Sequence, residues 1–211
     1  EPASLSSEDI AVEKVKVLKA ISSVEEFSMG RYESLGANSG HVVDVPTYAA
    51  LKLYVNTYLF ANIPIYVRTG KMQAEAKSLI YVKFKNTTKD VMHDQSIAEN
   101  AVIINIHPEL TIDISVNLKQ PNTSWKSKPV RFRFNQAETF GANTPEAYEQ
   151  ILQKILQGDK SLFPTMREIT ESWRIVTPML EHDDHTEVYP VRTLPRFANQ
   201  LADNNNFTWY I

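Results

Sequence analysis

A short segment that carries two cations beside a glycine is the strongest candidate for chemistry in this 211-residue chain. The apolar run 63–67 stops at Arg68, Thr69, Gly70 and Lys71. Arginine can bind phosphate through two parallel hydrogen bonds, lysine supplies a mobile point charge, and glycine suits a tight turn. We interpret the segment as a candidate phosphate-binding turn. An exposed turn with ordinary surface cations is the alternative, and this pattern alone favours it.

Other catalytic and metal-binding motifs are weak or missing. Segment 182–185 (H-D-D-H) has metal-ligand chemistry, but no third ligand lies near it in the sequence, so we favour a solvated turn and predict no metal site. The absence of cysteine excludes disulfides, thiolate nucleophiles and cysteine-based zinc sites. The chain also lacks the G-x-G-x-x-G, Walker, G-x-S-x-G and H-E-x-x-H motifs. The sequence therefore encodes no nucleotide-binding loop of these types.

The elements that must position the turn begin with a helix. Ser6 followed by Asp9 resembles a capping box, and apolar residues then recur at helical spacing up to Ile21. Segment 22–46 shows no such period and is rich in glycine, so we expect a loop or irregular structure there.

Strands are predicted wherever apolar and polar residues alternate, in segments 51–55, 63–67, 80–85, 102–106, 111–118 and 130–134. The clearest run places Ile112, Ile114, Val116 and Leu118 on one side and Thr111, Asp113, Ser115 and Asn117 on the other. Such alternation is typical of antiparallel sheets with one buried and one solvated face. We expect the apolar side to be the buried one.

Two helices follow the strands. Thr144 and Pro145 suit the start of the first and Gly158 its end, while Thr165 and Glu168 form a second capping-box pattern. A helix, then many strands, then helices is the order of an α+β protein, not of a βαβ repeat. We predict a large, mostly antiparallel sheet covered on one face by helices, in a single domain that spans residues 1–211.

Composition narrows the classes of partner. A net charge of −3 does not indicate a nucleic acid or an anionic membrane, and no apolar run approaches the 18 residues of a transmembrane helix. A basic stripe on the sheet is conceivable, but only Tyr81 is interleaved with it, so we favour a solvated face over a nucleic-acid surface. Its residues are Lys83, Lys85, Lys89, Arg131 and Arg133. We expect no signal peptide and a cytoplasmic protein.

Several stretches, in order along nearly the whole chain, resemble the glucose-6-phosphate dehydrogenase family. They are segments 13–18 (E-K-V-K-V-L), 30–32 (G-R-Y), 50–55 (A-L-K-L-Y-V), 63–71 (I-P-I-Y-V-R-T-G-K), 145–149 (P-E-A-Y-E), 158–159 (G-D) and 172–174 (S-W-R). The combination of R-T-G-K after a strand with P-E-A-Y-E is specific. The resemblance is to the C-terminal β+α domain of the family, without its N-terminal dinucleotide-binding domain.

The resemblance implies a function for the whole enzyme and a smaller one for this chain. The family oxidises glucose 6-phosphate at C1, passes hydride to NADP⁺ and feeds the pentose phosphate pathway. Its catalytic residues lie upstream of the matching region, so this chain is expected to contain no catalytic residue and to be inactive alone. The sheet commonly forms the dimer interface in the family, which implies a homodimer or homotetramer.

Individual residues inherit expected binding roles. Lys71 matches a lysine that helps hold the sugar phosphate, and His107 stands where many members place a substrate-contacting glutamine. In some members, positions that match Arg68, Lys77 and Trp209 help hold a second, structural NADP⁺.

Departures from the family pattern weaken the second of these expectations. Ala76, Tyr81, Asn105 and Ser115 stand where some members have cations for the structural NADP⁺ phosphates. The family's G-S-W-G-P region reads V-R-T-L-P over residues 191–195, without its glycines. A non-catalytic relative that serves as a dimerising scaffold or assembly factor is therefore the alternative function.

Overall fold

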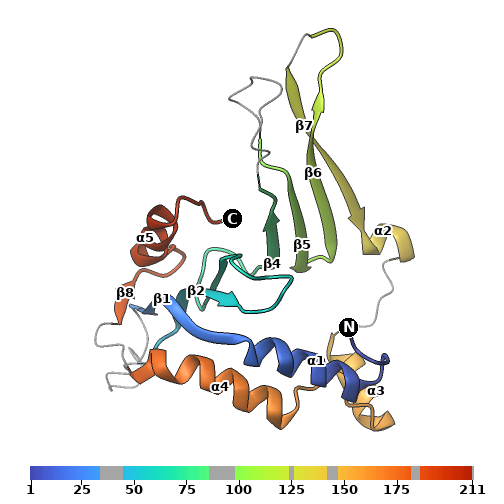
Figure 1. The fold of residues 1–211 in the computed structure, drawn as a ribbon, viewed down its shortest axis with the longest axis vertical. Helices are drawn as coiled ribbons and strands as arrows, with labels where there is room; N and C mark the ends of the chain where they lie inside the picture. Colours follow the sequence, from blue (N-terminus) through green and yellow to red (C-terminus); the bar gives the residue numbers. More distant parts are fainter. Residues whose placement is uncertain (34–44, 86–97, 124–125, 142–146, 182–185, 211) are drawn as a thin grey trace. The chain divides into compact units, whose positions relative to one another are not determined.

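The computed structural model describes residues 1–33, 45–85, 98–123, 126–141, 147–181 and 186–210. These residues fall into two compact units (Figure 1). The first unit is built from residues 1–74 and 146–209, and the second from residues 75–145 with Tyr210. Helices and mostly antiparallel strands confirm the α+β prediction, with the strands divided between two four-stranded sheets.

The sheet of the first unit has the strand order β3-β2-β1-β8. Its members are β1 (Ile21–Tyr32), β2 (Tyr48–Val55), β3 (Ile65–Gly70) and β8 (Glu187–Tyr189). Strands β1, β2 and β3 pair antiparallel, and β8 adds to the β1 edge in the parallel direction. The strand that ends in the R-T-G-K segment is therefore an edge strand of this sheet.

Strand β1 corrects the expectation of a loop over residues 22–46. Its register with β2 shifts between Ile21 and Val24 and again between Val24 and Glu26. Each shift breaks the two-residue alternation on which the prediction depended, so a 12-residue strand carried no clear pattern. Residues 34–44 of the same stretch lie outside the described part of the chain.

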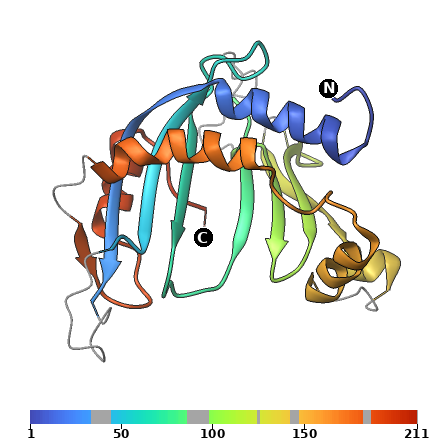
Figure 2. The same cartoon turned by 90° about the horizontal axis from the view of Figure 1, so that it is seen from below.

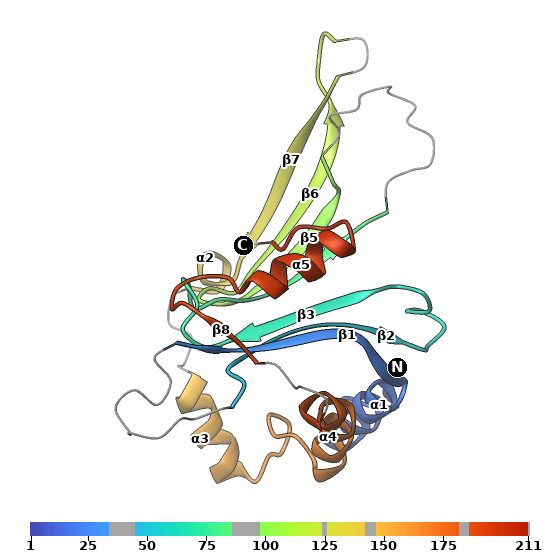
Figure 3. The same ribbon diagram turned by 90° about the vertical axis from the view of Figure 1, so that its left-hand side faces the viewer.

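Helices cover both faces of this sheet. Helices α1 (Ser7–Lys19) and α4 (Met166–Glu181) lie side by side against one face, and α5 (Arg196–Asn204) packs on the other (Figures 2 and 3). Arg174 of α4 ties the first pair to the sheet, because its guanidinium donates to the main-chain oxygens of Leu18 and Ile21, at 2.9 and 3.0 Å.

The predicted helix caps are confirmed where the structure describes them. The Ser6 hydroxyl accepts the Asp9 N–H at 3.2 Å. Thr165 and Glu168 exchange hydrogen bonds at the start of α4, at 2.7 and 3.3 Å. Gly158, at φ 67°, follows α3 (Ala147–Gln157) as expected for a helix C-terminus. The predicted cap at residues 144–145 lies outside the described residues.

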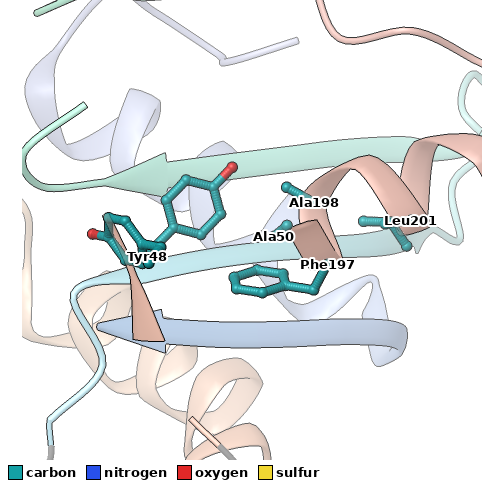
Figure 4. Packing of buried hydrophobic residues seen from close by; sticks show 6 residues of the cluster. Tyr48, Ala50, Phe197, Ala198 and Leu201 are labelled. Carbon is teal, nitrogen blue, oxygen red and sulfur yellow. The ribbon is translucent and has the colours of Figure 1, made fainter. Parts of the chain in front are cut away.

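The core of the first unit has two parts, one on each face of the sheet. On the face that carries α5, small residues of β2 and α5 let the helix approach the sheet closely (Figure 4), since Ala50 and Ala198 are fully buried. Tyr48, Tyr189, Phe197 and Leu201 complete this cluster. The opposite face buries Ile21, Leu53 and Val55. A sheet that is buried on both faces gives the residues at its edge a stiff support.

The second unit contains the order β4-β5-β6-β7, with all pairs antiparallel. Its strands are β4 (Ser78–Lys83), β5 (Ala101–His107), β6 (Thr111–Lys119) and β7 (Ser127–Asn135), and the short helix α2 (Gln136–Phe140) follows.

The expected burial of this second sheet is wrong. Most of the side chains predicted to be buried are open, with exposures that run from 37% at Ile112 to 56% at Phe132, while Val102, Ile104, Val116 and Val130 are half-buried. The polar side is the covered one, because Thr111 and Asp113 are 5% and 1% exposed. Alternation shows that two faces differ in polarity, but which face is covered depends on what packs there, and the helices α1, α4 and α5 pack on the other sheet. The open face is called the apolar face below; it includes Ile80, Val82, Ile106, Ile112, Ile114, Phe132 and Phe134.

Two cations of the supposed basic stripe, Lys83 and Arg133, form ion pairs. Arg133 donates to both carboxylate oxygens of Asp113, at 2.7 and 3.0 Å, and this contact holds the pKa of Asp113 below its usual value. Lys83 pairs with Glu99. The charges of Lys83 and Arg133 are thus neutralised within the chain, which does not favour a nucleic-acid surface; Lys89 lies outside the described residues. Among the helices that the structure describes, none is long and apolar enough to cross a membrane.

Candidate functional site

The main chain of Lys71 is held in place directly after strand β3. Its N–H donates to the Thr47 oxygen at 2.8 Å. Its carbonyl oxygen accepts the Tyr189 hydroxyl at 2.9 Å and the Gln73 side-chain amide at 3.3 Å. The side chain itself is exposed. The arrangement is therefore a free ammonium group on a fixed main-chain position, which is what a binding lysine needs.

The main chain of Met72 is also held by a hydrogen bond from the segment that follows β8. The Met72 oxygen accepts the Arg192 N–H at 2.7 Å, and both residues have left-handed backbones, at φ 52° and 61°. The turn after β3 is thus tied to the connection between β8 and α5. Sequence reasoning missed this connection as a support, because partners so far apart along the chain leave no local pattern.

The ring of Tyr48 leaves no room for a side chain at Gly70. A Cβ atom placed on Gly70 would lie 2.2 Å from a ring carbon of Tyr48, far inside the contact distance. Burial raises the pKa of Tyr48 to about 12, while the charge of Arg68 acts in the opposite direction. Tyr48 therefore remains a neutral phenol at physiological pH, and its ring fills the space that a side chain at Gly70 would need.

The structure brings together Arg68 and Trp209, two of the residues expected at a structural NADP⁺ site. The guanidinium carbon of Arg68 is 5.1 Å from the Trp209 ring centroid, and the indole N–H donates to the Ala198 oxygen at 2.7 Å. Phe207 packs edge-on against Trp209 and also contacts Tyr66. The aromatic C-terminal segment is in this way fastened to β3 and α5.

Lys77 and His107 belong to the second unit, whereas Lys71, Arg68 and Trp209 belong to the first. The Lys77 ammonium is 5.6 Å from the ring of Tyr210, which stacks on Tyr81 at 4.9 Å. His107 ends strand β5, opposite Ser78 of β4, and its side chain is exposed.

The second unit fits the phosphates of a structural NADP⁺ poorly. Tyr81 and Asn105 stand at positions expected to be cationic, but Tyr81 is stacked on Tyr210 and the Asn105 amide donates to the Thr111 hydroxyl at 2.8 Å. Neither can take the place of a phosphate-binding cation. The described residues contain no group of three or more potential metal ligands, and the H-D-D-H segment lies outside them.

The two sheets and the helices that pack on them define an α+β fold built on mostly antiparallel strands. Residues 1–210 match the family model of the glucose-6-phosphate dehydrogenase C-terminal domain. This chain therefore belongs to that family.

Individual relatives agree. Glucose-6-phosphate 1-dehydrogenase of Chlamydia muridarum (strain MoPn / Nigg) is 31% identical over 99% of this chain and 46% of its own length. The Aspergillus niger enzyme of the same name is 31% identical over 90% of this chain and 40% of its own length. The chain thus spans about half the length of the curated relatives it matches.

Solved structures show the same fold. A glucose-6-phosphate dehydrogenase in complex with its substrate glucose-6-phosphate superimposes on all of this chain and 47% of its own, with a TM-score of 0.82 and 26% identity. Glucose-6-phosphate 1-dehydrogenase from Mycobacterium avium superimposes on 96% of the chain with a TM-score of 0.81 and 21% identity. The second likeness concerns the fold alone.

Proposed function

We propose that this chain is the sheet-forming half of an NADP-dependent glucose-6-phosphate dehydrogenase of the cytoplasm. It supplies part of the sugar-phosphate site and the interface between subunits. The observation that carries the first role is the fixed main chain of Lys71, which presents an exposed ammonium group directly after the R-T-G segment. The membership of the family and the named ligand of one relative support the choice of substrate.

In this proposal Lys71 binds and orients the phosphate of glucose 6-phosphate, and His107 adds a second contact to the substrate. NADP⁺ accepts the hydride from C1 of the sugar and is bound by residues outside this chain, so no residue here moves a proton or a hydride. A charge-assisted contact contributes about 1.5–3 kcal/mol, whereas micromolar affinity needs about 8 kcal/mol. We therefore expect this chain alone to bind the sugar phosphate weakly.

The second role uses the apolar face of the β4-β5-β6-β7 sheet. Soluble monomers rarely expose contiguous apolar patches of more than a few hundred Å². Interfaces between identical subunits are more apolar than the rest of the surface, and a two-fold axis lets one face meet its own copy. We therefore assign this face to self-association, which yields a homodimer or, with a further contact, a homotetramer.

A dimerising scaffold without catalytic function is the second candidate. The open apolar face serves both candidates equally, and Arg192 at φ 61° lies in the region where the family pattern has glycines. Binding of the sugar phosphate separates the two, since a scaffold has no need of it.

Replacing Lys71 by alanine is expected to weaken the binding of glucose 6-phosphate to this chain by about 10-fold or more, the size of one charge-assisted contact. The binding is measured by titration of amide chemical shifts in two-dimensional NMR spectra, with unphosphorylated glucose as the comparison ligand. Lys19→Ala, which removes a different exposed cation at the end of α1, is the matched control and should bind as the unsubstituted chain does. Equal affinity in Lys71→Ala and the control would contradict the sugar-phosphate role.

A further inference from the structure

We propose that Tyr189 is a positioning residue for Lys71, so that its hydroxyl sets the affinity for the sugar phosphate without touching it. The inference deepens the proposed sugar-phosphate role and rests on it. The Tyr189 hydroxyl donates to the Lys71 carbonyl oxygen at 2.9 Å, across 118 residues of sequence. It is a direct tie between strand β8 and the turn that follows β3.

The tie is part of a hydrogen-bond network that links Tyr189, Thr47 and Lys71. A phenol has a single proton, and Tyr189 gives it to the Lys71 oxygen. The Thr47 hydroxyl lies 3.0 Å from the Tyr189 oxygen and can donate to it, since its other acceptor, the Gly30 oxygen, is farther away at 3.5 Å. Thr47 in turn accepts the Tyr32 N–H at 3.1 Å, and its own main chain bonds to both Gly30 and Lys71. Thr47 thus helps to orient the Tyr189 hydroxyl, and this hydroxyl holds the Lys71 carbonyl oxygen.

Burial makes this hydrogen-bond network rigid at Tyr189. Tyr189 is 1% exposed, and its ring packs edge-on against Tyr48 with the centroids 5.7 Å apart. The main chain of Tyr189 is paired with Tyr32 in the sheet, and its oxygen accepts the Glu33 N–H at 3.0 Å. The phenol therefore cannot follow Lys71 if the turn moves, and the turn must instead adopt the position that the phenol sets.

The functional consequence follows from the flexibility of lysine. The ammonium group is at the end of a four-carbon stem, so the protein controls its location mainly through the main chain. Displacement of binding groups by about 1 Å can cost large factors in function, even when the altered residue is remote from the ligand. Tyr189 is therefore expected to act on phosphate affinity through Lys71.

Tyr189→Phe removes one hydroxyl and keeps the ring. We expect the dissociation constant for glucose 6-phosphate to rise by about 3- to 10-fold, the size of one ordinary hydrogen bond. Tyr32→Phe is the matched control, because Tyr32 packs against the same core but enters the chain of bonds only through its main-chain N–H. The control should leave the affinity unchanged.

A double-mutant cycle separates positioning from a general structural effect. In the Lys71→Ala background, Tyr189→Phe should change the remaining affinity by less than a factor of two, because the group that it positions is gone. An equal loss in both backgrounds would contradict positioning. If Lys71→Ala has no effect, the sugar-phosphate role itself fails; if Lys71→Ala weakens binding and Tyr189→Phe does not, only the present inference fails.

Thr47 offers a second test should Tyr189→Phe disturb folding. Thr47→Val removes the hydroxyl that is hydrogen-bonded to the Tyr189 hydroxyl, and Thr47→Ser keeps it. We expect weaker binding of glucose 6-phosphate with valine and near-normal binding with serine. The same affinity in both variants would overturn the inference.

Discussion

Replacing Ile114 by glutamate is expected to convert the protein from a dimer to a monomer. Ile114 lies near the middle of the apolar face, paired with Val102 on one side and Phe132 on the other, and 43% of its surface is exposed. In an interface with two-fold symmetry the substitution buries two carboxylates, one from each subunit. The cost of burying an unpaired charge is several kcal/mol, so the dissociation constant should rise by at least about 100-fold.

Sedimentation velocity over a range of protein concentrations measures this change. Leu59→Glu is the matched control, because it adds the same charge at an exposed leucine of the β2–β3 connection, which belongs to the first unit. The control should remain a dimer. A monomeric unsubstituted chain at all concentrations, or an Ile114→Glu variant that associates as the control does, would contradict the proposed interface.

Replacing Gly70 by alanine is expected to destabilise the first unit strongly. The new Cβ atom would lie 2.2 Å from one ring carbon of Tyr48 and 2.9 Å from another. Tyr48 is 3% exposed and is packed against Tyr189 and Phe197, so its ring has no free space into which it could turn. Overpacking of this kind costs about 1–3 kcal/mol and occasionally more.

Chemical denaturation of the variants gives the free energy of unfolding. The cause can be checked with Tyr48→Leu, which removes the overlapping ring. If the clash is responsible, the double variant should lose less free energy of unfolding than the two single variants lose together, because without the Tyr48 ring the new methyl group at position 70 meets no clash. Strict additivity, or a Gly70→Ala variant as stable as the unsubstituted chain, would show that Tyr48 does not fix the identity of Gly70.

Local patterns predicted many of the elements because their causes are local. The hydroxyl of Ser6 and the box of Thr165 and Glu168 act within one helical turn, so the residues themselves reveal the caps. Alternation located most strands for the same reason. It failed for β1, where two register shifts with β2 interrupt the period.

Burial could not be predicted in the same way. The alternation of β6 correctly separates Ile112 and Ile114 from Thr111 and Asp113, but the covered face is the polar one. Asp113 could have given a hint, since the register of β6 and β7 places it opposite Arg133. A pair of opposite charges can stabilise a covered polar face, whereas the apolar face needs a partner that the sequence of one chain does not display.

For the candidate site, too, local sequence patterns predicted some of the residues and missed others. Arg68 and Lys71 directly follow an apolar strand, so their spacing singles them out in the sequence, and the structure places Arg68 against Trp209. Tyr189 and Thr47 carried no signal, because their contribution is a set of bonds between segments that are distant in sequence. The roles of Lys71 and His107 in binding remain predictions.

The rate of NADP⁺ reduction by the purified 211-residue chain tests the central claim most directly, at glucose 6-phosphate concentrations that saturate the NMR titration. We expect saturated binding of the sugar phosphate without reduction above the protein-free rate, since the hydride chemistry belongs to residues outside this chain. Reduction that saturates with glucose 6-phosphate and disappears in Lys71→Ala would contradict the division of the enzyme into a chemical half and this binding, sheet-forming half.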